Sequence, residues 1–133
     1  MSGFNTDVVS ILKHCNMCST SSYGVVLGGT DAKAGKDVYD YLSKLGLRVA
    51  NGYMRQIKMW DYIIIPRKHS SVRRLVEAIT SLNSLGIIII ETTGVDAKIE
   101  ERYNSVDSVL SATKVVYEDR SYLVVHTGNE YGN

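Results

Sequence analysis

Apolar residues recur at helical spacing in four places along the chain. In the clearest case, Val38, Tyr41, Leu42 and Leu45 occupy the i, i+3, i+4 and i+7 positions of one face, and Gly46 is suited to end the helix. The other three predicted helices cover residues 6–14 with Thr6 as N-cap, residues 71–85 with Ser70 or Ser71 as N-cap, and residues 96–110.

Short apolar runs bounded by turn residues predict the strands. Residues 23–27 lie between glycines, and residues 87–90 are four isoleucines without polar alternation. We expect that second run to be covered on both faces, as in the centre of a sheet. Residues 47–53 and 61–65 are separated by too few residues for a parallel crossover, so we predict an antiparallel hairpin or a bulged turn.

The order of elements predicts an α/β fold. Residues 114–117 and 122–126 flank a turn and should close the chain as a β-hairpin. We predict a single domain over residues 1–133, with one mixed sheet of about five or six strands flanked by three or four helices. Residues 1–22 would form an N-terminal helix and loop, and residues 127–133 a flexible tail.

Composition narrows the class of protein. The 133 residues are 44% hydrophobic and 22% charged, which is typical of a globular chain and argues against disorder. No apolar run approaches the roughly 20 residues of a membrane span. The first ten residues have neither a basic region nor a long apolar region, so we predict a cytoplasmic protein without a membrane partner.

The net charge of +1 conceals a gradient along the chain. Residues 55–74 carry six basic side chains against Asp61 alone, whereas residues 75–133 carry four basic and nine acidic side chains. Cations interleaved with aromatic rings suit phosphate contact and base stacking. The alternative is a solvated face that meets the acidic half of the chain. The predicted nucleic-acid-binding residues are Arg55, Lys58, Trp60, Tyr62, Arg67, Lys68, Arg73 and Arg74.

A glycine-rich segment, residues 28–37, lies between a predicted strand and a predicted helix, where backbone N–H groups can hold phosphate. It departs from GxxxxGK[ST] because five residues separate Gly29 from Gly35, and Asp37 replaces the Ser or Thr that binds magnesium. The segment resembles the GTDxxxGKT loop of dethiobiotin synthetases over about nine residues. An ordinary βα loop is the alternative. The predicted phosphate-binding residues are Gly28, Gly29, Thr30, Gly35 and Lys36.

Few other residues suggest a catalytic or metal-binding site. Asp61 begins one strand and Glu91 ends another, as a metal-dependent nuclease would require, but the lysine two residues after Glu91 is missing. Cys15 and Cys18 form a C-x-x-C pair without further ligands nearby, so a disulfide, free thiols and a metal shared between subunits all stay open. We assign no catalytic residue, no metal and no cofactor.

We therefore predict a small α/β binding module that contacts an anionic partner, either nucleic acid or a nucleotide phosphate. One alternative is a homo-oligomeric structural or interaction protein, such as a homodimer formed through tyrosine-rich faces and the edge of the terminal hairpin. Another is an enzyme, either a degenerate phosphate-loop hydrolase using Lys36 or a nuclease using Asp61 and Glu91.

Overall fold

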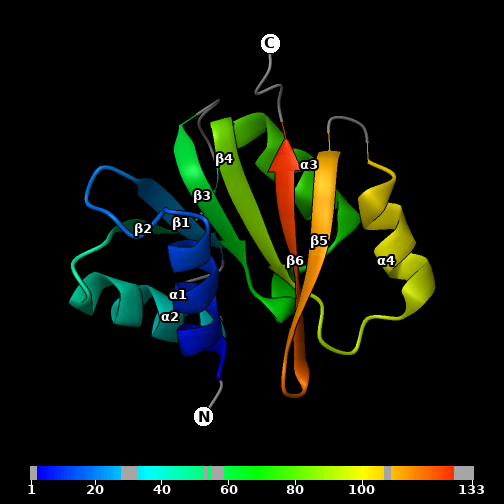
Figure 1. Cartoon of the computed structure of the whole chain (residues 1–133), viewed down its shortest axis with the longest axis horizontal. Helices are drawn as coiled ribbons and strands as arrows, with labels where there is room; N and C mark the ends of the chain where they lie inside the picture. The colour runs from blue at the N-terminus through cyan, green and yellow to red at the C-terminus, as the bar shows by residue number, and fades with distance from the viewer. Residues whose placement is uncertain (1–2, 28–32, 53, 55–58, 107–108, 128–133) are drawn as a thin grey trace.

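The computed structural model describes residues 3–27, 33–52, 54, 59–106 and 109–127. At its centre is one six-stranded sheet, which confirms the predicted mixed α/β fold. The strands are β1 (Tyr23–Leu27), β2 (Arg48–Gly52), β3 (Trp60–Ile65), β4 (Leu82–Glu91), β5 (Val109–Tyr117) and β6 (Arg120–Thr127). Their order across the sheet is β2-β1-β3-β4-β6-β5 (Figure 1). Strands β1 to β4 are mutually parallel, and β6 runs antiparallel to both β4 and β5.

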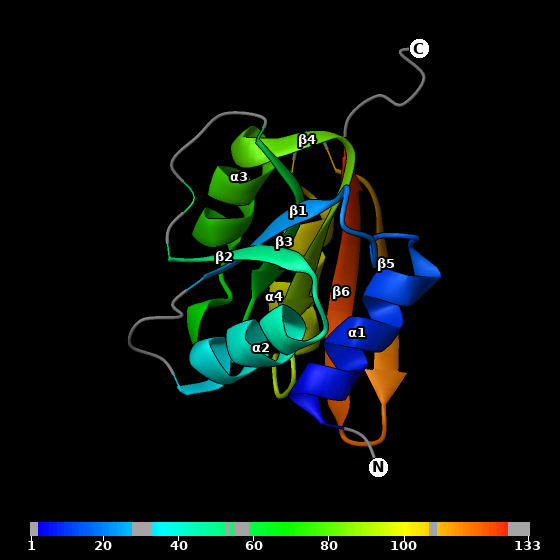
Figure 2. The same ribbon diagram turned by 90° about the vertical axis from the view of Figure 1, so that its left-hand side faces the viewer.

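Helices cover both faces of this sheet. On one face lie α1 (Phe4–His14) and α2 (Lys33–Lys44), whose apolar residues join those of alternate sheet positions in one buried cluster. On the other face lie α3 (Val72–Ser81) and α4 (Ala97–Asn104), which form a second cluster. Figure 2 shows α1 and α2 on the near side of the strands, with α4 behind them. No helix within the described ranges is long and apolar enough to cross a membrane.

The isoleucine run of β4 is buried on both faces as the sequence predicts, and β3 beside it is buried as well. Residues 63–65 of β3 and residues 87–90 of β4 are almost fully shielded from solvent. Their side chains alternate between the two clusters, so each isoleucine run has apolar neighbours above and below the sheet. The terminal hairpin of β5 and β6 is also confirmed.

The predicted antiparallel pairing of residues 47–53 with residues 61–65 is wrong. Strands β2 and β3 do not pair with each other, because β1 lies between them and is parallel to both. The connection of seven residues can span roughly 23 Å when extended. That exceeds the roughly 17 Å length of a five-residue strand, so a crossover past one strand needs no helix.

Three helix boundaries differ from the prediction. Helix α1 begins at Phe4, because the Thr6 hydroxyl accepts a hydrogen bond from the Gly3 N–H and so supports the start of the helix from inside it. Helix α3 begins after Ser71, which is the N-cap, but it ends at Ser81 because Leu82 pairs with Trp60 in the sheet. Helix α4 ends at Asn104, so residues 109–110 belong to β5 instead.

Candidate functional site

The strand order creates one distinctive position on the sheet. The chain passes from β1 to β2 on one side and then returns to β3 on the other side of β1. In open α/β sheets, ligands bind outside the carboxyl ends of the strands at such a switch point. We name this end of the sheet, where β1 to β4 finish and β6 begins, the carboxyl edge.

Several described residues converge on the carboxyl edge. Gly52 ends β2, Arg67 follows β3, Glu91 ends β4, and Arg120 begins the antiparallel strand β6. Gly52 has a backbone φ of +136°, and a Cβ placed on it would meet no described atom within 4 Å although the residue is buried. The parallel direction of β2, β3 and β4 and the antiparallel direction of β6 therefore bring one small residue and three charged residues to the same end of the sheet.

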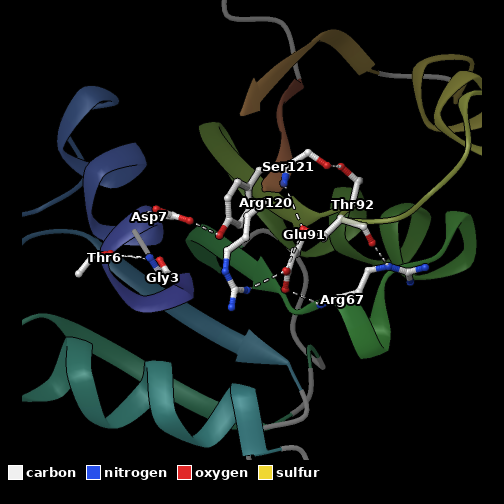
Figure 3. A network of polar contacts seen from close by, with 10 residues as sticks. Gly3, Thr6, Asp7, Arg67, Glu91, Thr92, Arg120 and Ser121 are labelled. Atoms are coloured by element: carbon white, nitrogen blue, oxygen red, sulfur yellow. Dashed lines mark hydrogen bonds and ion pairs between the residues drawn. The ribbon is translucent and has the colours of Figure 1, made fainter. Parts of the chain in front are cut away.

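Glu91 is the centre of a polar network at this edge (Figure 3). Its carboxylate accepts hydrogen bonds from the Arg67 backbone N–H at 3.3 Å, the Thr93 hydroxyl at 3.0 Å and the Arg120 guanidinium at 3.2 Å. The Glu91 side chain is 7% exposed and that of Arg120 is 39% exposed. A carboxylate can be buried in this way because both oxygens have donors and one of its partners is a cation.

Backbone and hydroxyl groups form hydrogen bonds between the start of β6 and the residues that follow β4. The Thr92 N–H donates to the Ser121 carbonyl at 2.8 Å, and the Ser121 N–H donates to the Thr93 hydroxyl at 3.1 Å. The Arg67 Nε–H donates to the Thr93 carbonyl at 2.8 Å, and another guanidinium nitrogen donates to Ser70 at 3.1 Å. The segments after β3 and β4 are therefore held in fixed positions relative to each other.

Helix α1 is attached to the same end of the sheet. The Tyr122 hydroxyl donates to the Asp7 carboxylate at 2.7 Å, and the Phe4 ring stacks near the Tyr122 ring with centroids 6.2 Å apart. Burial, together with the hydrogen bond to Asp7 and the Asp7 charge, raises the pKa of Tyr122. Tyr122 therefore stays protonated and donates at neutral pH. Sequence reasoning missed this contact because its two residues are so far apart in the chain.

The predicted cationic residues that lie within the described ranges do not form one free surface. Arg73 and Arg74 both pair with Glu77, at 3.7 Å and 3.0 Å, on the exposed side of α3. Arg67 donates within the network described above, and Lys68 is exposed in a short 3-10 helix, Arg67–His69. The protein's own acceptors thus engage three of these arginines. Arg55 and Lys58 lie outside the described residues.

The predicted stacking role of Trp60 and Tyr62 is wrong. Trp60 is 4% exposed and Tyr62 is fully buried, so neither ring face is open to a nucleic-acid base. Trp60 packs against the Tyr23 ring, with centroids 4.9 Å apart, and the Tyr62 hydroxyl donates to the Arg48 carbonyl at 3.1 Å. Both aromatic residues lie in a strand that is covered on both sides, which the local sequence did not reveal.

The glycine-rich segment is described only in part. Gly35 is buried within α2, and Lys36 forms an exposed ion pair with Asp40 one turn later, at 3.1 Å. Such i, i+4 pairs are common on helix surfaces and do not indicate a ligand. The other predicted phosphate-binding residues, Gly28, Gly29 and Thr30, lie outside the described residues.

Asp61 and Glu91 do not form a metal site. Asp61 accepts hydrogen bonds from the Tyr23 N–H at 2.9 Å and the Asn83 amide at 3.1 Å, at the end of the sheet where β1 and β3 begin. Glu91 lies at the opposite end, so the nuclease-like interpretation is wrong. Across the described ranges, no three His, Cys, Asp or Glu side chains are grouped to hold a metal ion.

Cys15 and Cys18 are free thiols, each with a pKa raised by burial. Cys15 lines a cavity of about 330 Å³ between the end of α1 and the β5–β6 hairpin, together with His14 and His126. This cavity lies on the α1 face of the sheet, away from the switch point.

Comparison with known proteins identifies the fold of the chain only. No family model matches the chain, and no curated protein matches it. Among solved structures, the ribosomal protein L11 methylase of Lactobacillus delbrueckii subsp. bulgaricus has a TM-score of 0.59 at 12% identity, with 97% of this chain and 81% of that chain covered. The tRNA (m1A58) methyltransferase TrmI of Aquifex aeolicus has 0.59 at 11% identity, with 96% and 70% covered. A structure of PigF with SAH has 0.52 at 12% identity, with 80% and 50% covered.

The chain has the fold of S-adenosylmethionine-dependent methyltransferases. It spans half the length of PigF, and 60% of that of another similar structure, a mutant of MtNAS. The prediction of a module for nucleic acid or nucleotide phosphate is therefore wrong. Solved structures with this fold include methyltransferases. Of the cations on which the prediction rested, three arginines are engaged by the protein itself, Lys68 is exposed, and Arg55 and Lys58 lie outside the described residues.

Proposed function

We propose that this chain binds S-adenosylmethionine (SAM) and its demethylated product SAH at the carboxyl edge, above the switch point between β1 and β3. The observation that carries the proposal is the strand order β2-β1-β3-β4, which puts a switch point at the middle of the parallel strands. Solved structures that share this fold support it: two are named as a methylase and a methyltransferase, and another is PigF with SAH.

The described residues at this edge fit the nucleoside part of such a ligand. Dinucleotide-binding folds place a ribose-binding side chain about 20 residues after the first glycine-rich turn, at the end of the second strand. Here that position holds Asn51, whose amide can donate and accept hydrogen bonds, in place of an acidic residue. Gly52 beside it leaves room toward the described part of the edge. When bound, SAM would supply an electrophilic methyl group.

Calorimetric titration of the full chain with SAH and SAM tests the proposal. We expect saturable binding, and Gly52→Ala should weaken it at least about tenfold because the methyl group fills the space beside the ligand. Gly46→Ala is the matched control: its φ of +87° also disfavours a side chain, and it follows α2 at the opposite end of the sheet. Absence of binding up to about 1 mM ligand, or equal effects of the two variants, would contradict the proposal.

We extend the proposal to methyl transfer, the activity named for the L11 methylase and TrmI. The acceptor is not assigned. The cytoplasmic location stays a prediction. The homo-oligomeric state also stays a prediction, and light scattering of the purified chain tests it.

A further inference from the structure

Arg120 is placed unusually for a surface arginine. It is the first residue of β6, and because β6 is antiparallel to β4, it lies at the carboxyl edge. Its side chain crosses to Glu91 on β4, where one guanidinium nitrogen meets the carboxylate at 3.2 Å. Figure 3 shows Arg120 between Glu91 and the start of α1. The guanidinium is thus anchored by a buried acid while its side chain stays 39% exposed.

Most hydrogen-bond donors of Arg120 are uncommitted among the residues that the structure describes. A guanidinium carries five N–H donors in a planar fork, and within the described part of the chain Glu91 is its one hydrogen-bond acceptor. Glu91 is poorly placed to contact a ligand, because its side chain is only 7% exposed. Arg67 uses its guanidinium on Thr93 and Ser70, and the exposed Lys68 beside it has no planar fork. Among the described residues at this edge, Arg120 is therefore the arginine that can still bind a carboxylate with two parallel hydrogen bonds.

We infer that Arg120, held by Glu91, binds the carboxylate of the amino-acid end of SAM and SAH. This inference rests on the proposed function. The Arg120 guanidinium lies beside Glu91 on β4, and β4 is two strands from β1, a separation of roughly 10 Å. A ligand with its nucleoside at β1 and β2 needs an extended arm to reach that point, and the amino-acid chain of SAH is such an arm. Glu91 sets the position of the guanidinium without contacting the ligand.

Comparing two thioether ligands measures the contribution of this contact to the binding affinity. SAH and 5′-methylthioadenosine share the adenosine and the sulfur, and SAH alone carries the amino-acid end. We expect the native chain to bind SAH about ten- to hundredfold more tightly than methylthioadenosine, the effect typical of a charge-assisted hydrogen bond. Arg120→Gln should reduce this preference to nearly one and leave the affinity for methylthioadenosine unchanged. Arg120→Lys should keep part of the preference, since it retains the charge and loses the fork.

Arg73→Gln is the matched control, because it removes an exposed arginine that also pairs with a glutamate, on α3. It should leave both affinities unchanged, and thermal unfolding confirms that each variant is folded. If both ligands bind and Arg120→Gln keeps the preference for SAH, the inference is wrong and the proposed function stands. An equal loss for both ligands indicates a structural role for Arg120 and also overturns the inference. If neither ligand binds the native chain, both proposals fail.

Discussion

Tyr122 donates a hydrogen bond of 2.7 Å to Asp7, a residue 115 positions earlier in the chain. Asp7 is 2% exposed and Tyr122 is fully buried, so water cannot replace either partner. The bond joins the first turn of α1 to the antiparallel strand β6, beside the Glu91 network. It therefore ties the N-terminal helix to the carboxyl edge, where we propose that the ligand binds.

Removing either partner of this bond should destabilise the fold. We expect Asp7→Ala and Tyr122→Phe each to lower the free energy of unfolding by about 1–3 kcal/mol, because each leaves a buried polar group short of a partner. The double variant should lose less than the sum of the two. Urea unfolding of the four proteins measures this coupling. Tyr39→Phe is the control, since the Tyr39 hydroxyl makes no hydrogen bond within the described ranges. Strict additivity would contradict the prediction.

Stability should fall at alkaline pH. Burial raises the pKa of Tyr62 and of Tyr122 above the ordinary value of about 10. Above that pH the unfolded chain loses these protons while the folded chain keeps them, so deprotonation favours unfolding. The contribution of these tyrosines to the free energy of unfolding is fully present below about pH 10. Above that pH it should decline by roughly 1.4 kcal/mol per pH unit for each such tyrosine. Urea unfolding between pH 9 and 11 measures the slope. Tyr62→Phe should make it shallower, and an unchanged slope in this variant would contradict the prediction.

The close approach of β1 to the Tyr62 ring requires a glycine. A Cβ on Gly24 would overlap the Tyr62 ring. We expect Gly24→Ala to cost about 1–3 kcal/mol of unfolding free energy through overpacking. The cost should shrink in a Tyr62→Leu background, where the ring is absent. Gly3→Ala is the control, because its Cβ would lie 4.0 Å from the nearest described atom. An equal cost in both backgrounds would show that the ring is not the cause.

Asp61 should matter for stability and not for ligand binding. Asp61→Ala removes the acceptor of the Tyr23 N–H and the Asn83 amide, so we expect a loss of about 1–3 kcal/mol. The SAH affinity in calorimetry should be unchanged, because Asp61 lies at the end of the sheet opposite the carboxyl edge. Asp40→Ala removes an exposed ion pair with Lys36 and should cost under about 1 kcal/mol. A specific loss of SAH binding in Asp61→Ala would place the ligand elsewhere.

The local pattern predicted elements better than it predicted their partners. Residues 61–65 were predicted as a strand and residues 87–90 as a strand covered on both faces, and these runs lie in the two central strands of the sheet. Leu82 continued the apolar face of the preceding helix, yet it starts β4, because pairing beside Trp60 competes with helix propagation. The helical spacing of apolar residues carries no information about that competition.

The residues of the candidate site are not close together in the sequence. The basic segment and the glycine-rich turn stood out because their residues are close in sequence. The described network instead joins Arg67, Glu91 and Arg120, which are single polar residues in three separate segments, and the bond between Asp7 and Tyr122 lies beside it. Nothing local distinguishes them from ordinary surface charges. Their shared position appears only once β6 is known to run antiparallel beside β4.

The sequence by itself determined which segments bury their side chains, because apolar spacing and turn residues act over a few positions. That was enough to set the α/β class, the helices and the terminal hairpin. Only the tertiary structure decided that β3 crosses to the far side of β1, and that Arg120 meets Glu91 at the carboxyl edge. The physical reason is that strand order depends on long-range pairing between whole faces, and no residue carries a local signal of the strand that will lie beside it.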